Sequence, residues 1–151
     1  MQILVFIFVF FVFNTSKAEL LKPTPSLLPK EVISIQLSAL KNNNNPYENA
    51  GIKQTWEFAH PLNRKFTGPL SNFINMMYSN DYSIMLDHRQ HNIILLKKDI
   101  NISYFFIELF DIDGNKFGFN WTVEKVLIEG EFKDCSMTLS VSKPMSLAKS
   151  V

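Results

Sequence analysis

The sequence has very little cysteine and no block of charge of one sign. Among its 151 residues there is one cysteine, Cys135, and the formal net charge is +1. A single cysteine cannot form a disulfide within the chain, so stability must come from an apolar core. A nucleophilic cysteine needs an activating partner, and no motif supplies one. Cys135 is therefore interpreted as a small buried residue of a strand.

The basic residues are scattered, and no run of them exceeds two residues, as at Lys97-Lys98. Binding to phosphate groups needs clustered cations, so we expect no nucleic-acid partner. A polybasic signal for a membrane surface is missing for the same reason.

Metal-binding motifs are missing too. The three histidines, His60, His88 and His91, lack a metal-ligand spacing, so we expect no metal and no other cofactor. The segment from Asp111 resembles the start of a calcium loop, but its sixth position is lysine and its twelfth is threonine. That segment is interpreted as a hairpin instead.

One long apolar run is present, from Ile3 to Phe13 (ILVFIFVFFVF). It is too short to span a bilayer, which takes roughly 20 apolar residues. It matches the core of a secretory signal peptide, and the small residues Ser16 and Ala18 predict cleavage after Ala18. We therefore expect a periplasmic or secreted protein with no stable membrane span after signal cleavage. An uncleaved anchor or a hydrophobic first helix is the alternative.

The expected organisation is a signal peptide (1–18), a flexible leader (19–28), one domain (29–143) and a C-terminal tail (144–151). A first helix is predicted from Pro29, because proline suits the first helical position. Its apolar face has helical spacing and consists of Val32, Ile33, Gln36, Leu37 and Leu40. The four asparagines of 42–45 predict a solvated loop.

Two further helices are expected. The second runs from near Pro46 to about Ala59, and Gly51 within it marks close packing or a break. The chain then turns through Asn63 and Arg64, and a third helix starts at Pro69.

From residue 82 onward the apolar period changes from 3.6 to 2, which predicts strands over 82–86, 91–97, 100–112, 117–128 and 135–142. Asp113-Gly114 predicts a hairpin turn, and 129–131 a second turn. The segment 100–112 is apolar on both faces and should be covered on both. Helices followed by antiparallel strands indicate an α+β protein, in which three helices cover one face of a bent sheet and leave a cone-shaped cavity.

Several blocks of this sequence resemble one known family. They are GIKQTWEFAHPLNRKFTGPL (51–70), YSIMLDHR (82–89) and, at the end, Trp121 with CSMT (135–138). Together they resemble the family catalogued as domain of unknown function 4864 (DUF4864), which is grouped with the nuclear transport factor 2-like folds. The resemblance implies a nuclear transport factor 2-like cone. It implies no reaction, and no catalytic residue is carried over.

The best polar cluster is Asp87-His88-Arg89. In an extended strand, His88 would point one way, and Asp87 and Arg89 the other. Inside the cone, His88 could act as an acid/base group or contact a ligand, and Arg89 could clamp a carboxylate. Alternatively, the cluster ties the sheet to the loop at 63–64. The candidate ligand-binding residues are His88, Arg89, Tyr82, Trp121 and Trp56.

Three hypotheses follow. The first is a non-catalytic exported module that binds an apolar small molecule or a protein partner. The second is a small cone-fold enzyme of isomerase or hydratase type that uses His88, Asp87 and Tyr82 in an apolar pocket. The third is a structural homodimer formed through the sheet, with a cavity filled by phenylalanine and methionine side chains.

Overall fold

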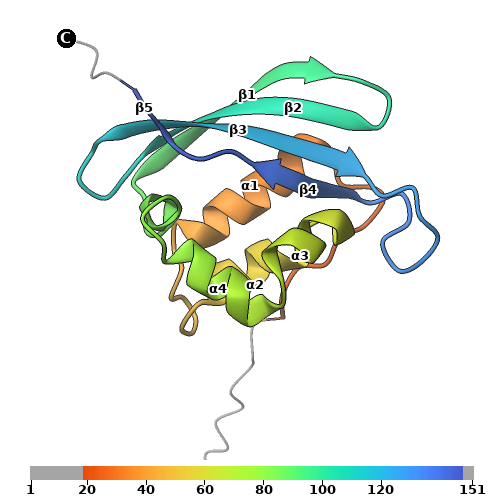
Figure 1. Cartoon of the computed structure of the whole chain (residues 1–151), viewed down its shortest axis with the longest axis horizontal. Coiled ribbons are helices and arrows are strands. Elements are labelled where there is room, and N and C mark those ends of the chain that lie inside the picture. The colour runs from red at the N-terminus through yellow and green to blue at the C-terminus, as the bar shows by residue number, and fades with distance from the viewer. Residues whose placement is uncertain (1–18, 148–151) are drawn as a thin grey trace, which may run out of the picture.

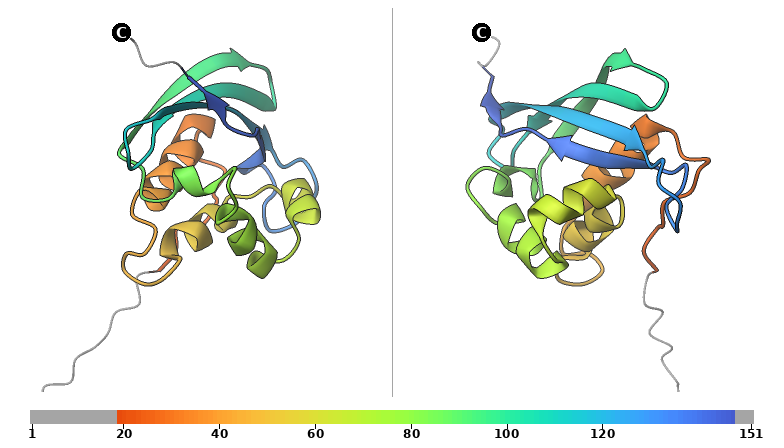
Figure 2. Two further views of the ribbon diagram at one scale, coloured as in Figure 1. Left: turned by 60° about the vertical axis from the view of Figure 1, so that its left-hand side comes forward. Right: turned by 45° about the vertical axis from the view of Figure 1, so that its right-hand side comes forward.

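The computed structural model describes residues 19–147, so the expected signal segment and the last four residues lie outside the described part. Four helices come first and five strands follow, which confirms the α+β class. The helices form one layer beneath the curved sheet (Figures 1 and 2). No helix within residues 19–147 is both long and apolar enough to cross a bilayer.

The first helix, α1 (Pro29–Leu40), begins as the sequence predicts. Pro29 occupies the first turn, and the Leu28 amide donates to the Glu31 carboxylate at 2.7 Å. The buried residues of α1 are the five predicted ones, Val32, Ile33, Gln36, Leu37 and Leu40. The helix therefore packs through one apolar stripe, as its period requires.

The second helix, α2 (Ala50–Glu57), is shorter than predicted and crosses α1 at Gly51. A Cβ atom at Gly51 would lie 2.8 Å from the carbonyl carbon of Ala39 and 2.9 Å from Cα of Asn43. Atoms this close overlap, so only glycine fits at the crossing. The prediction of close packing at Gly51 is confirmed.

The asparagine turn before α2 is not simply a solvated loop. Asn43 is buried, and its Oδ1 accepts from the Ile52 amide at 3.0 Å. Its carbonyl accepts from the Gly51 amide at 2.9 Å. Asn43 therefore caps the start of α2, a role that its short polar side chain suits.

A helix that the sequence did not predict, α3 (Pro61–Thr67), follows α2. Asn63 and Arg64 lie inside it, so the expected turn is wrong. Pro61 sits at the first helical position, and Nδ1 of His60 accepts from the Leu62 amide at 3.1 Å. Proline thus ends α2 and starts α3. The predicted helix that follows is α4 (Leu70–Met77).

The strand predicted at 82–86 is also wrong, because a short 3-10 helix, η1 (Ser83–Met85), stands there. The amides of Tyr82 and Ser83 both donate to the Ser79 carbonyl, so the chain closes local turns. No neighbouring strand is paired with this segment.

The sheet has the order β1 (Gln90–Lys98), β2 (Ile102–Phe110), β3 (Lys116–Lys125), β4 (Ser136–Val141). The short β5 (Met145–Ser146) also pairs with β3, within the segment expected to be a tail. The hairpin at Asp113-Gly114 is confirmed, since the Asp111 carboxylate accepts from the amides of Asp113 and Asn115. β3 ends at Lys125, so its predicted extension over 126–128 is wrong.

One face of the sheet makes the core with the helices. The buried inward residues are Ser103, Phe105, Ile107 and Leu109 on β2 and Phe119, Trp121 and Val123 on β3. The opposite face of β2 is only partly covered, and Tyr104 is 36% exposed. The prediction that β2 is covered on both sides is therefore wrong.

The junction of α2 and α3 continues the sheet beyond β4. The Thr138 amide donates to the Phe58 carbonyl at 2.8 Å, and the His60 amide donates to the Thr138 carbonyl at 2.9 Å. A parallel bridge between Ala59 and Thr138 results. This bridge fixes the helical layer to the edge of the sheet next to the cavity described below.

Candidate functional site

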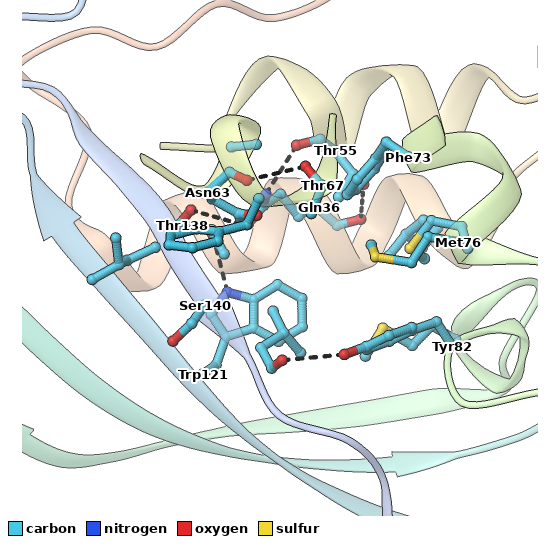
Figure 3. Close-up of a pocket in the computed structure, with 17 residues that line it drawn as sticks. Gln36, Thr55, Asn63, Thr67, Phe73, Met76, Tyr82, Trp121, Thr138 and Ser140 are labelled. Atoms are coloured by element: carbon cyan, nitrogen blue, oxygen red, sulfur yellow. Dashed lines mark hydrogen bonds between the residues drawn. The ribbon is translucent and has the colours of Figure 1, made fainter. Parts of the chain in front are cut away.

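A cavity of about 260 Å³ lies between the helices and the β3–β4 part of the sheet (Figure 3). Its apolar wall comes from both layers. The apolar and aromatic lining residues are Leu40, Ala59, Phe66, Phe73, Met76, Met77, Tyr82, Met85, Trp121, Leu139 and Val141. The polar ones are Gln36, Thr55, Asn63, Thr67, Thr138 and Ser140. None of these lining residues carries a charge, so the cavity is suited to an apolar group rather than a charged one.

The floor of the cavity is a closed hydrogen-bond network around Thr138. Its hydroxyl donates to Oε1 of Gln36 at 2.5 Å and accepts from the Trp121 indole N–H at 3.0 Å. Nε2 of Gln36 donates to the Thr55 carbonyl at 3.0 Å. Within residues 19–147, no buried side-chain nitrogen or oxygen lacks a partner. The floor therefore positions Trp121 and offers no free acid or base.

The structure brings two of the predicted site residues together in the cavity. Tyr82 and Trp121 both line it, and the Tyr82 hydroxyl donates to the Val141 carbonyl at 3.4 Å. Burial raises the pKa of the Tyr82 hydroxyl, and this effect is larger than the opposite effect of the Lys143 charge. Tyr82 is thus a neutral hydrogen-bonding group at one end of an apolar space.

The third aromatic candidate, Trp56, stands behind the wall rather than on it. Its ring packs on the Phe73 ring with centroids 5.1 Å apart. The Arg64 guanidinium also lies 4.9 Å from the Trp56 ring centroid. Trp56 therefore supports the cavity wall through Phe73.

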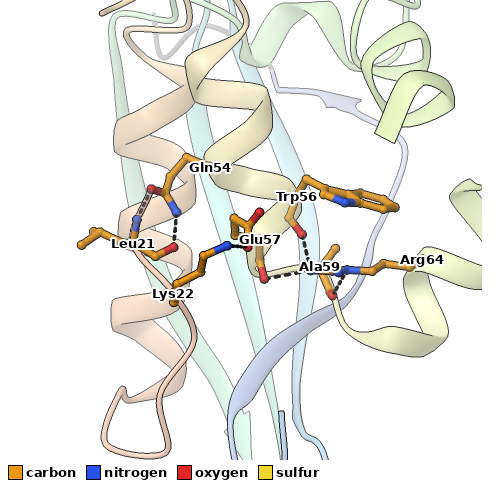
Figure 4. Close-up of polar contacts among 7 residues, drawn as sticks. All are labelled: Leu21, Lys22, Gln54, Trp56, Glu57, Ala59 and Arg64. Atoms are coloured by element: carbon orange, nitrogen blue, oxygen red, sulfur yellow. Dashed lines mark hydrogen bonds and ion pairs between the residues drawn. The ribbon is translucent and has the colours of Figure 1, made fainter. Parts of the chain in front are cut away.

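Arg64 explains much of the aromatic block at 51–70 (Figure 4). Its Nη2 donates to the carbonyls of Trp56 and Glu57, and its Nε donates to that of Ala59, all within 3.0 Å. Trp56 and Glu57 are the last two residues of α2 and Ala59 lies just beyond it, where no further helical turn follows to supply amide donors. One side chain thus caps α2, stacks on Trp56 and holds the break between two helices.

His88 does not line the cavity. It is buried, its Nδ1 donates to the Met85 carbonyl at 2.7 Å, and its Nε2 accepts from Nδ1 of His91 at 2.7 Å. Burial lowers the pKa of His88 to about 4, with smaller lowering contributions from His91 and Lys41. In their neutral form, His88 and His91 connect η1 to the start of β1 through these two hydrogen bonds.

Asp87 and Arg89 lie in the turn before β1 and are both exposed, so the extended-strand geometry expected for this cluster is wrong. Asp87 has φ of 54° and its Oδ1 accepts from the Asn43 amide at 3.1 Å. The Arg89 guanidinium lies beside the hairpin turn at Gly114. The cluster ties the sheet to the asparagine turn and not to residues 63–64.

The sequence did not single out the polar residues that form the floor of the cavity. Gln36 and Thr138 are 102 residues apart, and no local motif links them. The one available signal was Gln36 itself, a polar residue on the predicted buried face of α1. In the described part of the chain, no three His, Cys, Asp or Glu side chains are grouped closely enough to hold a metal ion.

The neutral state of His88 predicts a loss of stability in acid. The folded pKa of about 4 lies below the ordinary 6.5, so this contribution is complete above pH 6.5 and is lost as the pH falls toward 4. We expect the free energy of unfolding to drop by on the order of 2–3 kcal/mol across this window. Urea denaturation at pH 7 and pH 4.5 measures the drop. His88→Asn should reduce the drop, and the remainder should come from His60 and His91, whose pKa values burial also lowers. An unchanged dependence of stability on pH in this variant would contradict the role given to His88.

Comparisons of this chain with protein families, with curated proteins and with solved structures found no match.

Proposed function

We propose that this chain is an exported, non-catalytic module that binds an apolar small molecule in the cavity between β4 and helices α3 and α4. The observation that carries the proposal is a lining without a single charged side chain. A cavity of this kind gains binding energy by removing apolar ligand surface from water.

The size of the cavity limits the ligand. At about 260 Å³ it exceeds the ~150 Å³ cavity that takes benzene. It is slightly smaller than the range of about 300–1,000 Å³ typical of drug-sized ligands. Met76, Met77 and Met85 all contribute to the wall, and methionine side chains adapt to irregular shapes. These features favour a small or narrow ligand.

The geometry favours binding over catalysis. Of the three residues in the enzyme hypothesis, His88, Asp87 and Tyr82, only Tyr82 lines the cavity. A general acid or base must come within hydrogen-bond reach of the reacting atom. The buried bonded pair at His88 and His91 lies outside the lining, so it has no such reach.

The remaining parts of the proposal come from the sequence and from the arrangement of the layers. We propose a nuclear transport factor 2-like cone of the DUF4864 kind, supported by helices that precede a curved antiparallel sheet with a cavity beneath it. Export is supported by the apolar run before Ala18. A homodimer through the sheet is supported by the partly exposed outer face, where Ile94 is 42% exposed.

The test is native mass spectrometry of the mature protein from its own exported fraction, combined with titration of the apolar fluorescent probe N-phenyl-1-naphthylamine. We expect a co-purifying small molecule and saturable probe binding. Val141→Phe, which fills the cavity mouth, should weaken probe binding about tenfold or more. The matched change Ile94→Phe, on the outer sheet face, should leave it unchanged. Equal binding by wild type and Val141→Phe would refute the cavity as the site.

A further inference from the structure

The cavity has an open side and a closed side. Its floor residues Gln36, Thr55 and Thr138 are buried, whereas Ser140 is exposed and Phe66 is 91% exposed. A ligand therefore enters between β4 and helices α3 and α4. Its far end must stop at the network around Thr138.

One end of the opening carries the charged groups nearest to Tyr82. Nζ of Lys143 lies 3.1 Å from the Asp81 carboxylate. Asp81 directly precedes the lining residue Tyr82, and Lys143 comes two residues after the lining residue Val141. Both charges act on the pKa of Tyr82, which is raised by burial first and by Asp81 second and lowered by Lys143. The ion pair therefore bridges the two walls at the Tyr82 end.

We propose that the ligand is an aliphatic carboxylate whose chain fills the cavity and whose head group binds Lys143 and the Tyr82 hydroxyl. This inference rests on the proposed function and names its ligand class. The Tyr82 hydroxyl bonds to the Val141 carbonyl, and Lys143 follows Val141 by two residues, so both donors lie toward one end of a cavity whose lining carries no charge. An amphiphile with one anionic head requires donors at one end only.

The two donors are available for such a head group. The Tyr82 hydroxyl makes a long bond of 3.4 Å to the Val141 carbonyl, so a carboxylate oxygen is a better acceptor. The Lys143 side chain is 81% exposed, and exposed ion pairs contribute little. Lys143 can therefore leave Asp81 and pair with a ligand carboxylate at little cost in free energy. An ammonium head group at this end would lie beside the Lys143 cation and would compete with it for Asp81.

The walls fit an aliphatic chain. Met76, Met77 and Met85 provide flexible, polarisable surfaces that follow a chain of any curvature. Each methylene that leaves water should tighten binding by about fourfold until the cavity is full.

The experiment compares decanoate, decanol and decylamine, each below its micelle-forming concentration, by displacement of N-phenyl-1-naphthylamine at pH 8. We expect decanoate to bind about tenfold more tightly than the other two. Lys143→Gln should remove this advantage and leave decanol binding unchanged. Lys97→Gln is the matched control, because Lys97 is also exposed and paired with an aspartate, Asp99, but stands on β1.

The outcomes separate the two proposals. Equal binding of all three probes, or an undiminished decanoate advantage in Lys143→Gln, would overturn the carboxylate inference and leave the cavity function standing. Failure of every probe to bind the wild type would overturn both proposals. Octanoate and dodecanoate test the chain, since tightening with length is expected only if the chain enters the cavity.

Discussion

Replacing Gly51 with alanine is expected to destabilise the protein by about 2–4 kcal/mol. At an unconstrained helical position the same change stabilises by about 1 kcal/mol. Here the added methyl group would meet the backbone of Ala39 and Asn43, and backbone cannot move aside as a flexible side chain does. α1 and α2 would have to separate, which loosens the floor of the cavity. Chemical denaturation of the two proteins measures the difference.

Gly130→Ala is the matched control for Gly51→Ala. Gly130 has a positive φ of 142°, but a Cβ atom there would meet nothing within 4 Å. We expect a cost of about 1–3 kcal/mol from backbone strain alone, with no change in probe binding. A Gly51→Ala protein as stable as the wild type would show that the two helices are not in close contact.

Replacing Thr138 with valine is expected to cost about 2–4 kcal/mol, although the two side chains have the same shape. The loss of one hydroxyl leaves the Trp121 indole N–H and Oε1 of Gln36 without their partners. Both groups are buried, and a buried polar group without a partner costs about 1–3 kcal/mol. Denaturation curves give the cost, and near-ultraviolet circular dichroism should report a reoriented Trp121.

Two further variants test this explanation. Thr122→Val removes a hydroxyl from the neighbouring strand, outside the network, and should cost less than about 0.5 kcal/mol. The double variant Gln36→Met with Thr138→Val should be less destabilised than the sum of the single changes, because both partners of one bond are removed. Additive costs would contradict a network.

Local sequence signals predicted the features that depend on residue spacing within one segment or on a turn between adjacent segments. The buried face of α1 follows from helical spacing alone, and the β2–β3 hairpin follows from Asp113-Gly114 between apolar strands. In both cases the period of the sequence and the packing agree.

The errors arose where one signal had two meanings. The second helix does end before Pro61, as the predicted end near Ala59 requires, yet Pro61 also starts α3 where a turn was expected. The alternation in residues 82–86 predicted a strand, but the amides of Tyr82 and Ser83 donate to the Ser79 carbonyl in local turns. Alternation alone does not make a strand when no partner strand lies beside it.

Only some residues of the candidate site could be predicted, because the sequence shows single residues but not the contacts between distant ones. Tyr82 and Trp121 were found because large aromatic residues are conspicuous in any sequence. The hydrogen bond between Gln36 and Thr138 could not be predicted, because it forms only when α1 packs against β4 in the folded protein. His88 was predicted as a site residue because it is titratable, but it is buried and bonded to Met85 and His91 and so has a structural role.

The bridge between Ala59 and Thr138 has a consequence for the order in which the molecule assembles. Strands β1, β2 and β3 form a meander whose partners are close in the chain, so they can pair early. The cavity floor, in contrast, waits for β4, because Gln36 has no hydroxyl partner until Thr138 arrives 102 residues later. A nascent chain that stops before β4 would hold its helices without the strand that fastens them. The floor of the cavity is therefore complete only once β4 has joined both the sheet and the helices.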